Sequence, residues 1–292
     1  MTASPVLPPR ITIVTPSFNQ APYLEATLKS VLDQNYPNLE YFVIDGGSTD
    51  GSTDILRRYA DRLTGWVSEP DHGHMHAINK GFARATGEIM AWINSDDMLC
   101  PWALQTVGHI FHDLSAVKWL TTQTPLRWNA AGEATAAYRV PGYCRTWFYR
   151  GRHLGSQRGF VGYIQQESTF WRRELWQAAG GRVDESESLA GDFELWLRFF
   201  KHADLVTADV PLGGFRQHVR QKTSDLDGYH VAAERILAPY RVNALQHPAA
   251  VWAAQWLFRL TGRGGQRFGS RLAQVHYDAI ANSWYYTSHY CI

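Results

Sequence analysis

The sequence predicts an α/β protein with a mostly parallel β-sheet flanked by helices. Four short apolar runs alternate with three amphipathic segments between residues 11 and 93. This alternation is typical of βαβ units, in which a helix connects two parallel strands. The chain has 292 residues, 45% apolar and 19% charged, so it has enough apolar material for a core of this kind.

The elements are expected in order from residue 10. Runs rich in β-branched residues predict strands, and apolar residues spaced three or four apart predict helices. The expected strands are 11–14, 39–44, 66–68 and 89–93, and the expected helices are 22–32, 52–63, 77–84 and 189–200. Pro16 is expected to end the first strand, because proline has no amide hydrogen for a sheet.

Three segments are expected along the chain. Residues 1–9 contain three prolines and no periodicity, which favours a flexible leader. Residues 10–225 are expected to form the main domain. Residues 226–292 have an Ala-rich, Trp-bearing helical pattern, which predicts a helical C-terminal extension. The pattern leaves open whether this extension packs on the domain, joins two copies or lies on a membrane.

Composition excludes several classes of protein. Twenty-eight basic residues oppose 27 acidic ones, which excludes a polycation built for nucleic acid. No apolar run reaches the roughly 20 residues that a membrane-spanning helix needs, and residues 1–10 lack a signal-peptide pattern. The three cysteines have no CxxC spacing and predict free thiols. We therefore expect a cytoplasmic protein.

Polar residues follow each of the four expected strands. In parallel sheets, ligands bind outside the carboxyl ends of the strands, so these residues are expected to share one edge. They are Thr15-Pro16-Ser17-Phe18-Asn19, Asp45, Glu69-Pro70-Asp71 and Asn94-Ser95-Asp96-Asp97. A purely structural sheet more often ends its strands in Gly, Pro and Asn turns, so we interpret this edge as a nucleotide-binding rim.

Two segments of the rim suggest specific chemistry. The adjacent carboxylates of Asn94-Ser95-Asp96-Asp97 suit Mg²⁺ or Mn²⁺, which prefer oxygen ligands and can bridge to phosphate. An Asx turn or helix N-cap is the structural alternative. In Asp45-Gly46-Gly47-Ser48, the glycines allow close approach of a ligand while Asp45 can accept from ribose or base; a plain strand-to-helix turn is the alternative.

Three further segments carry chemically capable side chains. His72-Gly73-His74-Met75-His76 favours a polar turn over a zinc site, with Lys80 near a phosphate. Asp192 at a helix start is either a cap or a rigidly held base. Phe215-Arg216-Gln217-His218 offers a metal-binding imidazole and a cation, or it is a basic surface loop.

In this order the motifs resemble the inverting glycosyltransferase family 2, whose members have the Rossmann-like GT-A fold. The resemblance covers about residues 10–225 and is carried by ITIVTPSFNQAPYLEATLKSVLDQNYPNLEYFVIDGGSTDGSTDILRRY (11–59), SEPDHGHMHAINKGFARATGEIMAWINSDD (68–97), QQESTFWRRELW (165–176), AGDFELWLRFF (190–200) and FRQH (215–218). It implies a nucleotide-diphospho-sugar donor, bound by residues 10–100, and an acceptor and catalytic half at 101–225.

The resemblance also implies roles for individual residues. Asp192 is the expected catalytic base, and the expected metal ligands for Mn²⁺ or Mg²⁺ are Asp96, Asp97 and His218. The expected donor contacts are Pro16, Ser17, Phe18, Asp45, Gly46, Asp71, Lys80, Asn94, Ser95 and Asp96. Two positions depart from the family pattern: Asn94 replaces the commoner Asp, and Gly191 replaces the Glu before the base.

The second half is expected to bind a carbohydrate or lipid-linked acceptor. Residues 139–182 hold eight arginines against two acidic residues, with Trp147, Trp171 and Trp176. They could stack a sugar, face an anionic lipid at the inner membrane surface, or form a solvated basic face over core tryptophans. Arg216, Trp171 and Glu167 are the predicted diphosphate or acceptor contacts. A nucleotidyltransferase and a non-catalytic sugar-nucleotide-binding module are the alternative functions.

Overall fold

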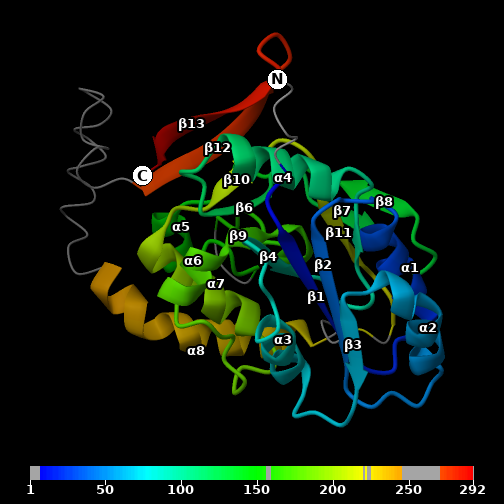
Figure 1. The fold of residues 1–292 in the computed structure, drawn as a ribbon. Helices are drawn as coiled ribbons and strands as arrows, with labels where there is room; N and C mark the ends of the chain where they lie inside the picture. The colour runs from blue at the N-terminus through cyan, green and yellow to red at the C-terminus, as the bar shows by residue number, and fades with distance from the viewer. Residues whose placement is uncertain (1–6, 156–158, 220, 222–224, 245–269, 292) are drawn as a thin grey trace, which may run out of the picture.

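A nine-stranded sheet runs through the computed structural model, which describes residues 7–155, 159–219, 221, 225–244 and 270–291 (Figure 1). Its strand order is β13-β12-β10-β6-β9-β4-β1-β2-β3. The bounds are β1 Ile11–Ser17, β2 Leu39–Asp45, β3 Gly65–Ser68, β4 Ile89–Trp92, β6 Trp119–Thr122, β9 Phe170–Arg172, β10 Val206–Ala208, β12 Ser270–Asp278 and β13 Ser283–Cys291. All neighbours pair in parallel except at β9 and between β12 and β13. The predicted α/β class with a mostly parallel sheet is confirmed.

Helices connect and cover the strands. Their bounds are α1 Ala21–Leu32, α2 Ser52–Tyr59, α3 His74–Phe82, α4 Ala103–Asp113, α5 Arg145–Tyr149, α6 Arg173–Ala178, α7 Gly191–His202 and α8 Leu226–Ala244. The predicted strands and helices between residues 11 and 93 are all present, with shifted ends. The first strand runs through Pro16 to Ser17, and α3 begins at His74, three residues before the predicted start.

Close packing of α3 on the sheet depends on Gly81. A Cβ atom at this position would lie 2.4 Å from Cγ1 of Val14 on β1, so any larger residue would push the helix away. This contact holds α3 against the centre of the sheet, close to the strand ends that the site uses.

A second, smaller sheet lies beside the first. Its order is β5-β11-β7-β8, with bounds β5 Met98–Leu99, β7 Leu126–Trp128, β8 Ala134–Ala137 and β11 Gly213–Arg216. β5 and β11 pair antiparallel, with Met98 opposite Gly214. Because Met98 follows the acidic turn after β4, this pairing brings residues 215–218 to that turn from more than a hundred residues away.

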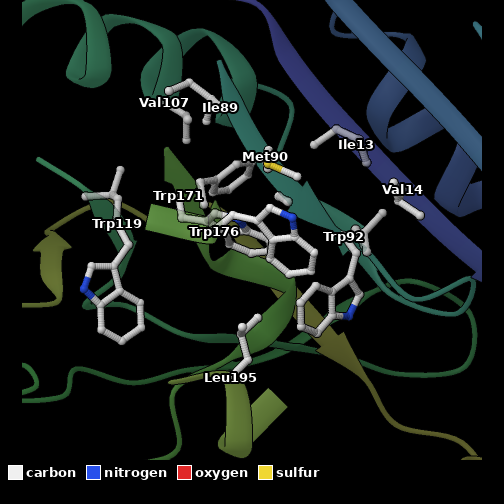
Figure 2. Close-up of a cluster of buried hydrophobic side chains, with 14 of the residues drawn as sticks. Ile13, Val14, Ile89, Met90, Trp92, Val107, Trp119, Trp171, Trp176 and Leu195 are labelled. Atoms are coloured by element: carbon white, nitrogen blue, oxygen red, sulfur yellow. The ribbon is translucent and has the colours of Figure 1, made fainter. Parts of the chain in front are cut away.

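Tryptophans occupy the centre of the core (Figure 2). Trp92, Trp119, Trp171 and Trp196 are all at most 2% exposed, and the ring centroids of Trp92 and Trp171 lie 5.5 Å apart. Trp176 is 5% exposed and lies in the same cluster. The prediction that Trp171 contacts a diphosphate or acceptor is therefore wrong, because its ring is enclosed by other aromatic rings.

The C-terminal segment is only partly helical. α8 is a helix as predicted, whereas residues 270–291 form a β-hairpin that joins the large sheet through β10 and β12, so the helical prediction is wrong there (Figure 1). The run SWYYTSHYC at 283–291 is rich in aromatic residues and includes Thr287, a composition that favours strands. The stretch 245–269, with two of the tail's tryptophans, and the leader residues 1–6 lie outside the described residues.

α8 packs on α5 and α7, so the described part of this segment packs on the domain.

Two other sequence predictions can be compared with the structure. Cys144 takes part in a disulfide bond, so the prediction of three free thiols is wrong, while Cys100 is a buried free thiol. Spacing along the chain did not reveal the pairing because a disulfide depends on proximity in the fold. Among the described residues, no helix combines the length and apolar character needed to cross a bilayer.

Candidate active site

The carboxyl ends of three neighbouring strands lie at the same level. The parallel register places Ser17 opposite Asp45 and Asp45 opposite Ser68. β4 pairs with the other side of β1, and the amide of Ile93 donates to the carbonyl of Val14, which brings the acidic turn to the same edge. The polar residues that were predicted to share one edge therefore do so, because parallel strands bring their ends together, and nucleotide binding at this rim stays a prediction.

Asp45 is fully buried and ties the rim together. Its Oδ2 accepts hydrogen bonds from the Gly47 amide (3.2 Å), the Ser48 amide (2.9 Å) and the Ser68 hydroxyl (2.6 Å). Its Oδ1 accepts from the Ser48 hydroxyl at 2.6 Å. Both carboxylate oxygens thus bind the loop itself, and a contact between Asp45 and a base or ribose stays a prediction.

The other predicted donor contacts lie around this loop. A Cβ at Gly46 would lie 2.9 Å from Oδ2 of Asp71, so these two residues adjoin. Phe18 is 61% exposed at the rim, whereas Ser17 is buried beneath it. Lys80 forms an ion pair with Glu69, so it already has an acidic partner where a phosphate contact was predicted.

The acidic turn after β4 is built around Asp97, which is 1% exposed. Its Oδ1 accepts from the Arg216 backbone amide at 2.8 Å, and its Oδ2 accepts from Nδ2 of Asn94 at 3.1 Å. Asn94 suits this position because an amide donates where a second carboxylate would repel. Burial, together with the charges of Asp96 and Glu167, raises the pKa of Asp97 well above its usual range.

Asp96 points to a histidine rather than to Asp97. Its Oδ2 lies 2.9 Å from Nε2 of His218, so the structure brings together two predicted metal ligands that are 122 residues apart. Tyr23 on α1 packs against both His218 and Arg216. Its ring centroid is 4.2 Å from that of His218 and 5.1 Å from the Arg216 guanidinium carbon. Sequence reasoning missed Tyr23, because no local pattern distinguishes it from other tyrosines.

The metal prediction can be tested against these side chains. The described part of the chain has no cluster of three or more His, Cys, Asp or Glu residues suited to a metal ion. Each oxygen of Asp97 accepts one hydrogen bond, from the Arg216 amide and from Asn94, and its role as a metal ligand stays a prediction. Asp96 and His218 remain as a pair of ligands, an oxygen and an imidazole, that Mn²⁺ accepts. A bound metal would take its other ligands from phosphate and water.

Asp192 lies in the first turn of α7. Its Oδ1 accepts a hydrogen bond from the Phe193 amide at 2.7 Å, and burial raises its pKa to about 6. The side chain therefore accepts from an amide of the first turn, and its pKa of about 6 suits a proton acceptor. Close packing explains why position 191 is a glycine, because a Cβ there would lie 2.6 Å from Cε of Met75.

Glu167 lies in the short turn of residues 166–168 before β9. It is 5% exposed, and burial, with smaller contributions from Asp192 and Asp96, raises its pKa to about 8. Arg216 is 2% exposed, and its Nε and Nη2 have no hydrogen-bond partner among the described residues. Asp96 thus acts electrostatically on both Glu167 and Arg216, and Asp192 acts on Glu167.

Three of the eight arginines at 139–182 form ion pairs with acidic residues. Arg139 pairs with Asp209 at 2.9 Å and Arg145 with Asp204 at 3.4 Å. Arg172 is buried and pairs with Glu88 at 3.3 Å. These three arginines therefore have acidic partners within the fold, and the choice among the interpretations of this segment stays open.

The structure thus has a mostly parallel sheet with polar loops at its strand ends, and comparison with known proteins places this arrangement among characterised folds. Residues 12–117 match the family described as Glycosyl transferase family 2. A Bacillus subtilis protein named as a teichuronic acid biosynthesis glycosyltransferase, TuaG, is 40% identical over 92 residues, which cover 30% of this chain and 36% of that protein. The matches to the curated relatives compared first span about a third of their length.

Two solved structures share the fold. TarS residues 1–349 of S. aureus, in complex with UDP-GlcNAc, superposes with a TM-score of 0.61 at 17% identity, covering 88% of this chain and 74% of that one. The mannosyltransferase PcManGT from Pyrobaculum calidifontis, in complex with GDP-Man and Mn²⁺, superposes with a TM-score of 0.52 at 19% identity, covering 90% of this chain and 84% of that one. The expected fold is thereby confirmed.

Proposed function

We propose that this protein is an inverting glycosyltransferase that moves a sugar from a nucleotide-diphospho-sugar to an acceptor hydroxyl. Asp192 carries the proposal, because it is a half-buried carboxylate at the start of α7 with a pKa of about 6. Both solved structures with this fold contain a nucleotide sugar, which supports the same class of donor here.

Each part of the site has a task in this reaction. The loop tied by Asp45, together with Asp71 and Phe18, would hold the nucleotide. Asp96 and His218 would hold a divalent cation, which supplies charge neutralisation for the leaving diphosphate. The buried guanidinium of Arg216 would add a fixed positive charge.

Asp192 would take the proton of the acceptor hydroxyl during the displacement. A positioned general base typically contributes about 10²–10⁴-fold to the rate. Inversion needs one such base, because the acceptor oxygen attacks the anomeric carbon directly as the sugar–phosphate bond breaks.

The wider role is proposed from the relatives. TuaG is named for teichuronic acid biosynthesis, which suggests that this chain also acts in bacterial polysaccharide or glycoconjugate synthesis. The acceptor would then be a carbohydrate or a lipid-linked carbohydrate, reached in the cytoplasm or at the inner face of the plasma membrane.

Donor binding and product analysis test the proposal together. Thermal unfolding is measured with UDP, GDP and dTDP, each with and without Mn²⁺; a ligand at 100 times its Kd adds about 2.7 kcal/mol of stability. The matching nucleotide sugar is then incubated with the protein, and the released nucleotide is identified. We expect a metal-dependent shift and nucleoside diphosphate release. Pyrophosphate release would indicate a nucleotidyltransferase, and binding without any turnover would indicate a non-catalytic module.

A further inference from the structure

A cavity of about 720 Å³ lies at the edge of the large sheet where the parallel strands begin, and we call it the amino-end cavity. Arg10 precedes β1, Glu88 precedes β4 and Lys118 precedes β6. Arg172 and Arg173 come from the carboxyl end of β9, which reaches this edge because β9 runs antiparallel to β4. Strand β1 has seven residues, so about 20 Å separate Arg10 from the rim at its other end. The amino-end cavity is therefore separate from the candidate active site.

Hydrogen bonds fix the wall of this cavity formed by residues 7–10. Nδ2 of Asn38 donates to the carbonyl of Pro8 at 2.9 Å, and the Tyr36 hydroxyl donates to the carbonyl of Pro9 at 2.7 Å. Nε of Arg10 donates to Oδ1 of Asn38 at 3.2 Å. The two prolines also restrict the backbone of this segment. The cavity is thus formed in advance of any ligand, as sites for small molecules usually are.

The lining of the cavity carries a net positive charge. Four basic and two acidic side chains belong to it: Arg10, Lys118, Arg172, Arg173, Glu88 and Glu174. Both acids are already paired, Glu88 with Arg172 at 3.3 Å and Glu174 with Lys118 at 2.5 Å. The chain as a whole has a net charge of only +1. An excess of two positive charges around one hollow attracts anions.

Arg173 has hydrogen-bonding capacity to spare. Its Nε donates to the carbonyl of Gly87 at 2.8 Å, which holds the guanidinium in the wall. Among the residues that the structure describes, Nη2 has no hydrogen-bond partner and the side chain forms no ion pair. A guanidinium has five N–H donors, and native proteins rarely leave such groups without acceptors. An anion in the cavity would supply acceptor oxygens.

We propose that the amino-end cavity binds a soluble phosphate monoester of metabolite size through Arg173 and Lys118. A guanidinium matches the geometry of phosphate oxygens, and an ammonium adds a point charge. A phosphate monoester carries about −1.5 to −2 at pH 7, which balances the excess of two positive charges. The cavity volume lies within the roughly 300–1,000 Å³ of small-molecule sites, so it has room for an organic group beside the phosphate. This second site does not depend on the transferase function proposed above.

Isothermal titration calorimetry on the full chain tests the proposal. The probes are glucose 6-phosphate, inorganic phosphate and, as the neutral comparison, glucose, at constant ionic strength and with EDTA to exclude metal-dependent binding at the active site. We expect glucose 6-phosphate to bind, inorganic phosphate to bind more weakly and glucose not to bind. Higher salt should weaken the binding, because it screens the attraction between charges.

Matched variants locate the ligand. Arg173→Gln should raise the Kd of glucose 6-phosphate at least tenfold, because a charge-assisted hydrogen bond is lost. Lys118→Gln should raise it about three- to tenfold, and this half-exposed side chain can change without disturbing the core. Arg139→Gln removes the same charge from an exposed arginine paired with Asp209, at the carboxyl end of β10, and should leave the Kd unchanged.

Arg216→Gln tests whether the phosphate binds in the active site instead. Loss of binding in Arg216→Gln but not in Arg173→Gln would place the ligand there and overturn the proposal.

Three further results would also overturn the proposal. They are no binding of either phosphate probe, equal binding of glucose, and a Kd that neither Arg173→Gln nor Lys118→Gln changes. Co-sedimentation with phosphatidylglycerol vesicles separates a lipid headgroup from a soluble ester, and binding to the vesicles alone would exclude the soluble ligand. Thermal unfolding of each variant without ligand shows whether it is folded, and the two cavity variants provide independent tests.

Discussion

The site has two sides: the rim at the strand ends around Asp45, and the group around Glu167 and Arg216. They differ in how many of their buried polar atoms form hydrogen bonds within the protein. On the rim, the carboxylate of Asp45 accepts four hydrogen bonds from nearby backbone and hydroxyl groups. On the other side, Oε1 of Glu167 and Nε and Nη2 of Arg216 are buried without hydrogen-bond partners among the described residues. The rim is therefore preorganised, whereas these atoms on the second side are left open to a ligand, an ion or water.

The largest expected effect comes from the second side. Asp192→Asn removes the proton acceptor but keeps the shape of the side chain, so we expect kcat to fall by about 10²–10⁴-fold. The nucleotide-induced thermal shift should persist, because the rim does not include Asp192. Chromatography of the released product measures kcat, and thermal unfolding of the same sample measures the nucleotide-induced shift. Equal loss of activity and of nucleotide binding would contradict the separation of the two sides.

The next effect concerns the stability of the rim. Asp45→Ala leaves the Ser48 amide and the Ser68 hydroxyl without their acceptor, and we expect the free energy of unfolding to fall by about 2–4 kcal/mol. Asp54→Ala is the control, since its pair with Arg57 is exposed and should contribute about 0–1 kcal/mol. Urea unfolding measures both variants. A loss below 1 kcal/mol for Asp45→Ala would mean that the rim is not held by this carboxylate.

The pH dependence of kcat/KM should report Asp192. The carboxylate accepts a proton only when ionised, and its pKa is about 6 in the protein. Activity should therefore rise with pH through about 6, and fall about tenfold for each unit below it. Initial rates between pH 4.5 and 8 measure this limb. A profile that is flat from pH 5 to 7 would exclude Asp192 as the group that titrates.

The smallest expected effect concerns Tyr23, whose ring contacts both His218, the partner of Asp96, and Arg216. Tyr23→Ala removes this ring, so His218 is held less firmly against Asp96, and we expect Mn²⁺ affinity in the presence of UDP to fall about three- to tenfold. Tyr23→Phe keeps the ring and should restore the affinity. Calorimetric titration of Mn²⁺ measures it, with Tyr285→Ala on the hairpin as control. Equal affinity in all these variants would remove Tyr23 from the positioning of His218.

The rim was predictable from sequence because each of its polar loops directly follows its own strand along the chain. Each strand is directly followed by its own polar loop, and parallel pairing then brings the loops together. The role of Asp97 was not predictable in this way. Its burial depends on β11, whose Arg216 amide arrives from 119 residues further along the chain. Adjacent acids at 96 and 97 look alike in sequence, although one faces His218 and the other supports the turn.

The tryptophans and the C-terminal segment show the same limit. Trp171 lies in a sequence motif that suggested a role in binding, yet its ring packs in the core between β4 and α7. Whether such a ring is buried or exposed depends on packing in three dimensions, which the motif does not reveal. Strands 270–278 and 283–291 become stable by pairing with β10 and with each other. Such non-local pairing overrides a helical pattern read from the sequence.

The pairing of β10 with β12 has a consequence for synthesis of the protein. Val206 pairs with Ala273, so the outer edge of β10 stays open on the ribosome until more than sixty further residues have emerged. An open edge next to a parallel sheet is a template for pairing with other chains. Truncation before residue 270 should therefore leave the proposed catalytic residues in place and still yield a protein that aggregates during expression.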